Sequence, residues 1–126
     1  MSKIDLKDLS LAIQNAYEGK KIDEVLVFYH PDIVMIGPSM RVPVKGIDEL
    51  KTVLEAQFKN PQRSVVKLSD FSIGEVGEDV FSVLCRIEGR QLIYYSSYGF
   101  RGWLSRVFVI SENIPKVIFE HLTLEK

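Results

Sequence analysis

The run VFSVLCRI at residues 80–87 decides the fold class, because it is almost continuously apolar and rich in β-branched and aromatic side chains. Two stretches of the same kind follow it, WLSRVFVI at residues 103–110 and VIFEHLTL at residues 117–124. Runs of this length and composition are typical of β-strands with both faces covered. We therefore expect a sheet in the C-terminal half, with helices on one face and a second subunit on the other.

The N-terminal half carries helical patterns instead. Gly19, followed by two lysines, is a stop signal for the first helix. A short helix is expected over residues 22–29 and a third over residues 47–59. The first helix presents one face on which these side chains recur at helical spacing: Leu6, Leu9, Ile13, Ala16 and Tyr17.

Between and after the helices the pattern predicts further strands. Residues 33–36 form a β-branched run too short for a helix, and residues 40–44 could return beside them. From Ser64 onward the apolar alternation slips phase near Ser69 and Asp70, which predicts a β-bulge that bends the strand. Residues 88–102 allow two alternatives: a turn at residues 88–90 with a separate strand after it, or one long hairpin that turns within residues 96–102.

Composition narrows the class of protein. The 126 residues are expected to form one domain, 1–126, of ordinary composition with a net charge of −1. No basic cluster suited to nucleic acid appears, and no apolar run is long enough to span a membrane. The single cysteine, Cys85, excludes an internal disulfide, and the first residues lack the apolar core of a signal peptide. A cytoplasmic protein is the simplest interpretation.

Three segments carry a resemblance to a known family. Residues 22–34, IDEVLVFYHPDIV, resemble a short helix that leads into a Tyr-x-Pro/Asp-Asp strand entry. Gly37 and Pro38, then KGIDEL at residues 45–50, resemble the lead into a third helix, and KVIFEHLT at residues 116–123 is similar to a terminal Trp-Lys-Ile-Val-His-Glu-His-Leu-Ser strand. In this order they resemble the nuclear transport factor 2-like superfamily, on its SnoaL-like branch, over nearly the whole chain.

The resemblance implies an α+β fold, a cystatin-like cup in which a bent antiparallel sheet wraps around three N-terminal helices. Some similarity extends to the association domain of calcium/calmodulin-dependent protein kinase, whose cup carries two inward arginines on neighbouring strands. Arg86 and Arg106 match those positions. Leu122 stands at the position of that domain's third arginine, and Pro115 at that of a tryptophan, so the match to its pocket is incomplete.

Arg86, Arg106 and His121 are the candidate ligand-binding residues. The planar guanidinium groups suit a carboxylate or carbonyl ligand, although either arginine could instead pair with a core carboxylate such as Glu88 or face solvent. His121 could be a general base or a core histidine, and Glu120 beside it should point to the opposite face of the strand. The histidines and the cysteine lack metal-site spacing, so neither a metal nor a cofactor is expected.

The sequence leaves three functions open. The first is a small-ligand-binding domain with a pocket between helices and sheet, for an anionic or carbonyl-bearing molecule. The second is an enzyme of the cyclase, dehydratase or isomerase kind with His121 as base. The third is a non-catalytic association domain. We expect a homodimer through the outer sheet face, and the aromatic cluster Tyr94, Tyr95, Tyr98, Phe100 and Trp103 favours an interface over a pocket mouth.

Overall fold

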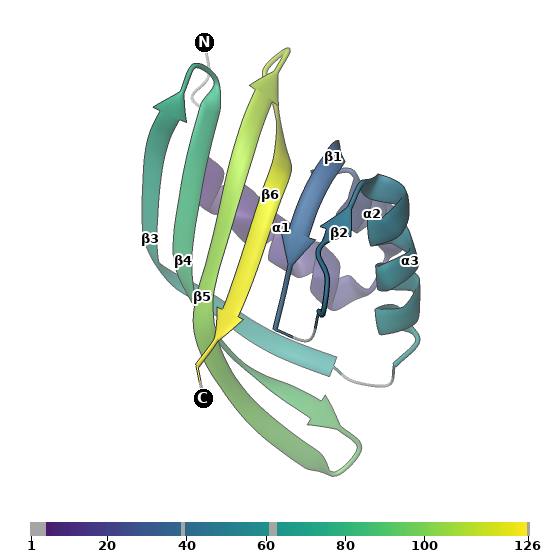
Figure 1. The fold of residues 1–126 in the computed structure, drawn as a ribbon. Coiled ribbons are helices and arrows are strands. Elements are labelled where there is room, and N and C mark those ends of the chain that lie inside the picture. The colour runs from purple at the N-terminus through teal and green to yellow at the C-terminus, as the bar shows by residue number, and fades with distance from the viewer. Residues whose placement is uncertain (1–4, 39, 61–62, 126) are drawn as a thin grey trace.

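The computed structural model describes residues 5–38, 40–60 and 63–125 of the chain. Helices and strands follow one another in the order that the sequence predicts (Figure 1). The elements are α1 (Leu6–Gly19), α2 (Ile22–Leu26), β1 (Tyr29–Ile36), β2 (Val44–Lys45), α3 (Ile47–Phe58), β3 (Arg63–Gly77), β4 (Val80–Ile93), β5 (Ser96–Ser111) and β6 (Ile114–Leu124).

The first helix begins and ends where its local signals place it. The Asp5 carboxylate accepts hydrogen bonds of 3.0 Å from two backbone N–H groups of the first turn, as an N-cap residue does. Lys20 ends α1 in a left-handed conformation with φ 55°. The second helix is shorter than predicted and ends at Leu26, because the chain is already extended and paired with β6 from Tyr29 onward.

The strands form one sheet in the order β2-β1-β6-β5-β4-β3. Every neighbouring pair runs antiparallel except β1 and β6, which run parallel. The sheet is therefore mixed, whereas the sequence predicts a wholly antiparallel one. The parallel pair joins strands from opposite ends of the chain, and no local pattern reveals such a contact.

Residues 88–102 belong to one long hairpin, so the second of the two alternatives is correct. The strands β4 and β5 pair continuously from Val80↔Val109 to Ile93↔Ser96. The turn falls on Tyr94 and Tyr95, earlier than predicted, with Tyr94 at φ 52°. The tip of this hairpin projects beyond the helices (Figure 1).

The predicted bulge in β3 is confirmed. Pairing with β4 passes from Ser69↔Arg86 directly to Ser72↔Leu84, so two residues of β3 face one residue of β4. The first of the two, Asp70, has φ 51°. A bulge adds twist and bends the strand, and it lies where β3 curves around the helices (Figure 1).

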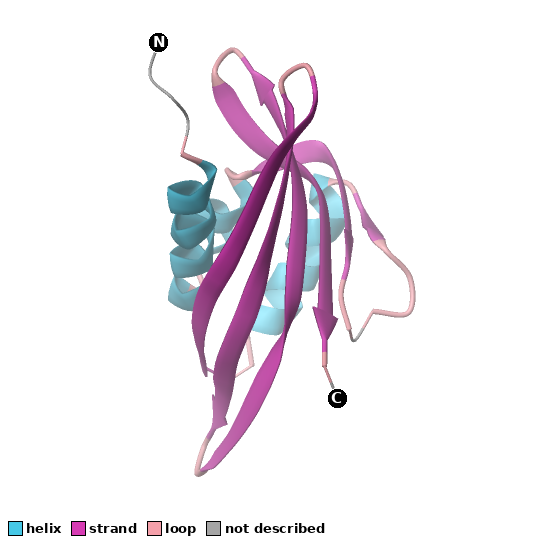
Figure 2. Cartoon of the chain, turned by 90° about the vertical axis from the view of Figure 1, so that its left-hand side faces the viewer, coloured by secondary structure: helices cyan, strands magenta, loops and turns pink. Residues whose placement is uncertain are grey.

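The helices lie on one face of the sheet, and the other face is uncovered (Figure 2). We call these the inner and the outer face. The α+β arrangement with three N-terminal helices is thus confirmed. The core on the inner face packs Val83, Phe108 and Val117 of the sheet against helix residues such as Ile13 and Leu54. A second cluster, Leu68, Cys85, Ile87 and Leu104, continues the inner face away from the helices.

In the described part of the chain, none of the helices has the length and apolar character needed to cross a membrane.

Candidate functional site

A charged pair is buried in the middle of the inner face. Arg106 of β5 and Glu120 of β6 are cross-strand partners, and Arg106 Nε lies 2.5 Å from Glu120 Oε1. Arg106 is 3% exposed and Glu120 7% exposed. Removing one charge from water is very costly, so each of these side chains needs the other to remain ionised inside the protein.

Two tyrosines extend this pair toward the helices. Tyr29, at the start of β1, donates its hydroxyl proton to Glu120 Oε1 over 2.7 Å. The hydroxyl oxygens of Tyr29 and Tyr17 are also 2.7 Å apart. Because the proton of Tyr29 goes to Glu120, the tyrosine of α1 must be the donor in that second bond. The result is a chain of hydrogen bonds from Tyr17 through Tyr29 to Glu120, which we call the inner network together with Arg106.

The environment favours neutral tyrosines beside an ionised pair. Burial, and secondarily the Glu120 carboxylate, raises the pKa of both Tyr17 and Tyr29 above the usual value. Burial alone would lower the pKa of Arg106, but Glu120 and the two tyrosines more than offset this and raise the pKa of the guanidinium. Arg106 is therefore a permanent cation, and the tyrosine hydroxyls are permanent donors, at neutral pH.

One donor of the inner network is left over. Arg106 Nη1 is buried, and no acceptor for it exists among residues 5–38, 40–60 and 63–125. An unsatisfied buried N–H costs about 1–3 kcal/mol, more on a charged group, so such atoms are rare in folded proteins. Arg106 Nη1 is thus a buried side-chain donor that the described residues leave without an acceptor.

The predicted site residues do not converge. Arg106 faces Val83 on β4, whereas Arg86 faces Trp103 on β5. Since Arg86 is three positions from Val83 along one strand, it points to the opposite, outer face. The prediction of one pocket lined by both arginines is therefore wrong, and only Arg106 lies between helices and sheet.

His121 also lies on the outer face, because β6 contains a bulge. Pairing passes from Phe108↔Val117 to Val107↔Phe119, so Ile118 is an extra residue. Beyond it the phase is reversed, and Glu120 rather than His121 shares the buried face with Val117. The His121 ring is exposed, with Nε2 3.3 Å from Thr123 Oγ1. The opposite orientation predicted for Glu120 and His121 is confirmed, but their faces are exchanged.

Sequence reasoning therefore missed Glu120, Tyr29 and Tyr17 as members of the polar cluster. For Glu120 the available signal was an acidic residue inside an apolar strand. For Tyr17 it was a hydroxyl on the apolar face of the first helix. Neither signal identifies its partner, because the inner network joins four elements, α1, β1, β5 and β6, from both halves of the chain.

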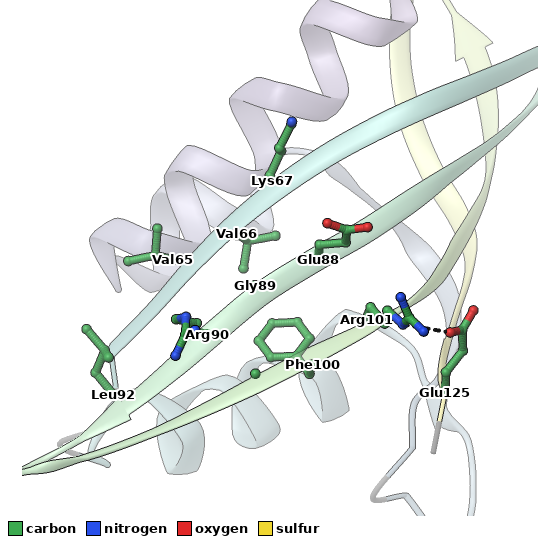
Figure 3. A pocket seen from close by; sticks show the side chains of 11 residues that line it. Val65, Val66, Lys67, Glu88, Gly89, Arg90, Leu92, Phe100, Arg101 and Glu125 are labelled. Atoms are coloured by element: carbon green, nitrogen blue, oxygen red, sulfur yellow. Dashed lines mark ion pairs between the residues drawn. The ribbon is translucent and has the colours of Figure 1, made fainter.

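The outer face carries a second polar cluster around Glu125. Arg86 Nη1 hydrogen-bonds Glu125 Oε1, and Arg101 Nε lies 3.0 Å from Glu125 Oε2. Arg86 also lies over the Trp103 ring, 5.0 Å from its centroid, and its Nε is 3.9 Å from Glu88 Oε1. The cluster adjoins an open groove of about 810 Å³ between β3, β4 and β5 (Figure 3).

The described ranges contain no group of three His, Cys, Asp or Glu side chains placed to hold a metal ion. Cys85 is buried on the inner face near Arg106, and burial raises the pKa of its thiol.

A model of the SnoaL-like domain matches residues 6–109. Curated proteins give no match to this chain. Among solved structures, a candidate scytalone dehydratase from Novosphingobium aromaticivorans is 13% identical, with a TM-score of 0.85 over 96% of this chain and 82% of that one. A candidate calcium/calmodulin-dependent protein kinase II association domain from Xanthomonas campestris is 11% identical, with a TM-score of 0.81 over 95% and 85%. A Catenulispora acidiphila protein in complex with S-DNPA is 14% identical, with a TM-score of 0.79 over 93% and 90%.

At these identities the solved structures show the fold alone. Together with the domain match they confirm the predicted resemblance, including its cystatin-like architecture.

Proposed function

Since the chain belongs to the SnoaL-like domain family, we propose that it is a small-molecule-binding domain whose guest places a carbonyl oxygen on Arg106, between helices and sheet. The observation that carries this proposal is the unpartnered Arg106 Nη1, a buried donor in the middle of the inner face. The solved Catenulispora protein of the same fold, in complex with S-DNPA, is consistent with a small guest.

The charge of the inner network favours a carbonyl over a carboxylate. Glu120 already neutralises Arg106 at 2.5 Å, so the pair as a whole carries no net charge. A carboxylate guest would bring an uncompensated negative charge into the interior, which is costly. A ketone, aldehyde, amide or ester needs only one donor, and Arg106 Nη1 offers one.

The test is a ligand screen with a matched pair of variants. We expect aromatic ketones and amides to raise the melting temperature of the wild type, whereas the corresponding carboxylates should not. Arg106→Lys keeps the charge opposite Glu120 but removes the guanidinium Nη1 that binds the carbonyl, so it should lose this stabilisation. Arg41→Lys, an exposed position, is the control and should respond as the wild type does. The proposal fails if no carbonyl compound stabilises the wild type, or if Arg106→Lys binds equally well.

Enzymatic turnover is a second candidate, favoured by the hydrogen-bond chain that ends on Glu120. A carboxylate that accepts from Tyr29 and Arg106 is the acid–base group within reach of the same interior site, whereas His121 lies on the outer face. A cyclase, dehydratase or isomerase activity that disappears in Glu120→Gln and persists in His121→Gln would support this candidate. The reverse result would restore His121 as the base.

Association is a third candidate, and it concerns the outer face. Leu84, Trp103 and Phe119 are 38–40% exposed there, on the neighbouring strands β4, β5 and β6. An apolar patch of this kind is typical of an interface, and a homodimer with a two-fold axis is the simplest assembly that covers it. Binding inside the cup and assembly through the outer face are compatible, and both fit a cytoplasmic protein.

A further inference from the structure

The outer groove is built from two kinds of side chain. Val65 and Leu92 give it an apolar part, and charged side chains surround that part. With about 810 Å³ of open volume, the groove has the size of a small-molecule site rather than of a protein interface.

At one end of the groove two arginines bind a single carboxylate. Arg86 binds one oxygen of Glu125 and Arg101 binds the other, at 3.0 Å, as Figure 3 shows for Arg101. The Trp103 ring supports Arg86, whose side chain is only 14% exposed. Two guanidinium groups that share both oxygens of one carboxylate form a specific and strong anion site.

Glu125 is an internal occupant of that site. Its backbone N–H donates to the Arg101 carbonyl at 2.8 Å, which places the side chain between the two guanidinium groups. The hydrogen bond from Arg86 lowers the pKa of the Glu125 carboxyl, so the occupant is ionised at neutral pH. The Glu125 side chain is nevertheless 39% exposed, and it can swing into solvent without disrupting a packed core.

The surrounding charges favour a second anion when Glu125 leaves. Lys67 and Arg90 also line the groove, so four cations face the acids Glu88 and Glu125. Without Glu125 the local charge is strongly positive, and the apolar wall formed by Val65 and Leu92 is unoccupied.

We propose that the outer groove is a binding site for a small carboxylate with an apolar body, and that Glu125 is its built-in competitor. The guest carboxylate takes the place of Glu125 between Arg86 and Arg101, and the apolar body lies against Val65 and Leu92. This site is distinct from the carbonyl site at Arg106, which lies on the other face of the sheet.

Competition from Glu125 lowers the affinity of the groove for an external carboxylate. If Glu125 releases the arginines for only about a tenth of the time, the apparent affinity for an external carboxylate is weakened about tenfold. Glu125→Gln removes the negative charge and keeps the size of the side chain, so it should bind the probe about tenfold more tightly than the wild type. Glu55→Gln changes the net charge equally at an exposed position on α3 and should leave binding unchanged.

The experiment is calorimetric titration of the folded protein with 4-phenylbutyrate and with its neutral amide, 4-phenylbutyramide. We expect the carboxylate to bind, the amide to bind much more weakly, and the Arg86→Gln/Glu125→Gln double variant to lose the gain of Glu125→Gln. Affinity should also fall with added salt, because Arg101 is exposed.

Three results would overturn the proposal: equal binding of amide and carboxylate, no gain in Glu125→Gln, or full binding without Arg86. Arg106→Lys separates this proposal from the interior one. It should bind 4-phenylbutyrate like the wild type even if it has lost every carbonyl ligand, since Arg106 lies on the inner face.

Discussion

Breaking the buried pair from one side should destabilise the protein far more than removing both charges. In Glu120→Gln the amide keeps its oxygen for the Tyr29 hydroxyl, but Arg106 loses its counter-charge while it remains 3% exposed. In Arg106→Met the flexible apolar side chain fills much of the same volume, and Glu120 is left with the tyrosine alone. Both variants thus place an unpaired charge among buried side chains.

The expected size follows from the burial of both partners. Removing one member of a buried ion pair costs about 3–5 kcal/mol, because the remaining charge is uncompensated. For a chain of 126 residues, 1 kcal/mol corresponds to about 4 °C in melting temperature. Glu120→Gln should therefore melt about 12–20 °C below the wild type, a large part of the total stability of a domain this size.

The double variant Arg106→Met/Glu120→Gln is the decisive measurement. Since it contains no unpaired charge, we expect it to be more stable than either single variant, with a coupling free energy of at least about 2 kcal/mol. Urea unfolding followed by circular dichroism gives the three free energies, and Glu55→Gln controls for the change in net charge. If the two single losses simply add in the double variant, the two side chains are not a coupled buried pair, and the inner network loses its basis.

Three further outcomes are expected. Burial raises the pKa of Tyr17, so near pH 10 the unfolded chain releases the phenol proton while the folded chain keeps it, and the free energy of unfolding falls as pH rises above about 10. Tyr17→Phe should flatten this fall when unfolding in urea is measured across alkaline pH. An unchanged slope in the variant would contradict the raised pKa. Trp103→Arg places a charge on the exposed outer patch and should yield monomers in analytical ultracentrifugation, whereas an unchanged dimer would move the interface elsewhere. Gly102→Ala should lower the free energy of unfolding by about 1–3 kcal/mol or more, because its Cβ would meet the Thr123 carbonyl, a backbone group that cannot move aside. Gly99→Ala is the control: its Cβ would meet no atom within 4 Å, so its melting temperature should equal that of the wild type.

Local signals in the sequence predicted a large part of this fold. The cap at Asp5, the stop after Gly19 and the bulge at Asp70 each follow from residues within a few positions of the feature. The three helices, the long apolar strands and the family resemblance were predictable for the same reason. The parallel pairing of β1 with β6 was not, because it depends on two strands that are adjacent only in space.

The candidate site was predictable only in part, because the sequence does not fix which side chains of a strand point to the inner face and which to the outer face. Strand periodicity places Arg106 correctly, because β5 alternates regularly from Gly102 to Phe108 around it. It fails for Arg86, because an inward or outward direction depends on which β5 residue stands opposite, and a resemblance to another domain does not fix that register. Arg86 is three positions from the buried Val83 on β4, and an odd spacing within one strand puts two side chains on opposite faces.

The exchange of His121 and Glu120 follows from one additional residue. Counted in steps of two from the buried Val117, the sequence places His121 inside and Glu120 outside. Ile118 bulges between them, so the alternation restarts and the carboxylate turns inward, opposite Arg106. A buried arginine provides the physical reason for this arrangement: it requires an anion, and with His121 in that place it would face a group that cannot neutralise it. The electrostatic requirement of Arg106 therefore selects Glu120 as its partner, and the bulge in β6 is the local backbone change that makes this pairing geometrically possible.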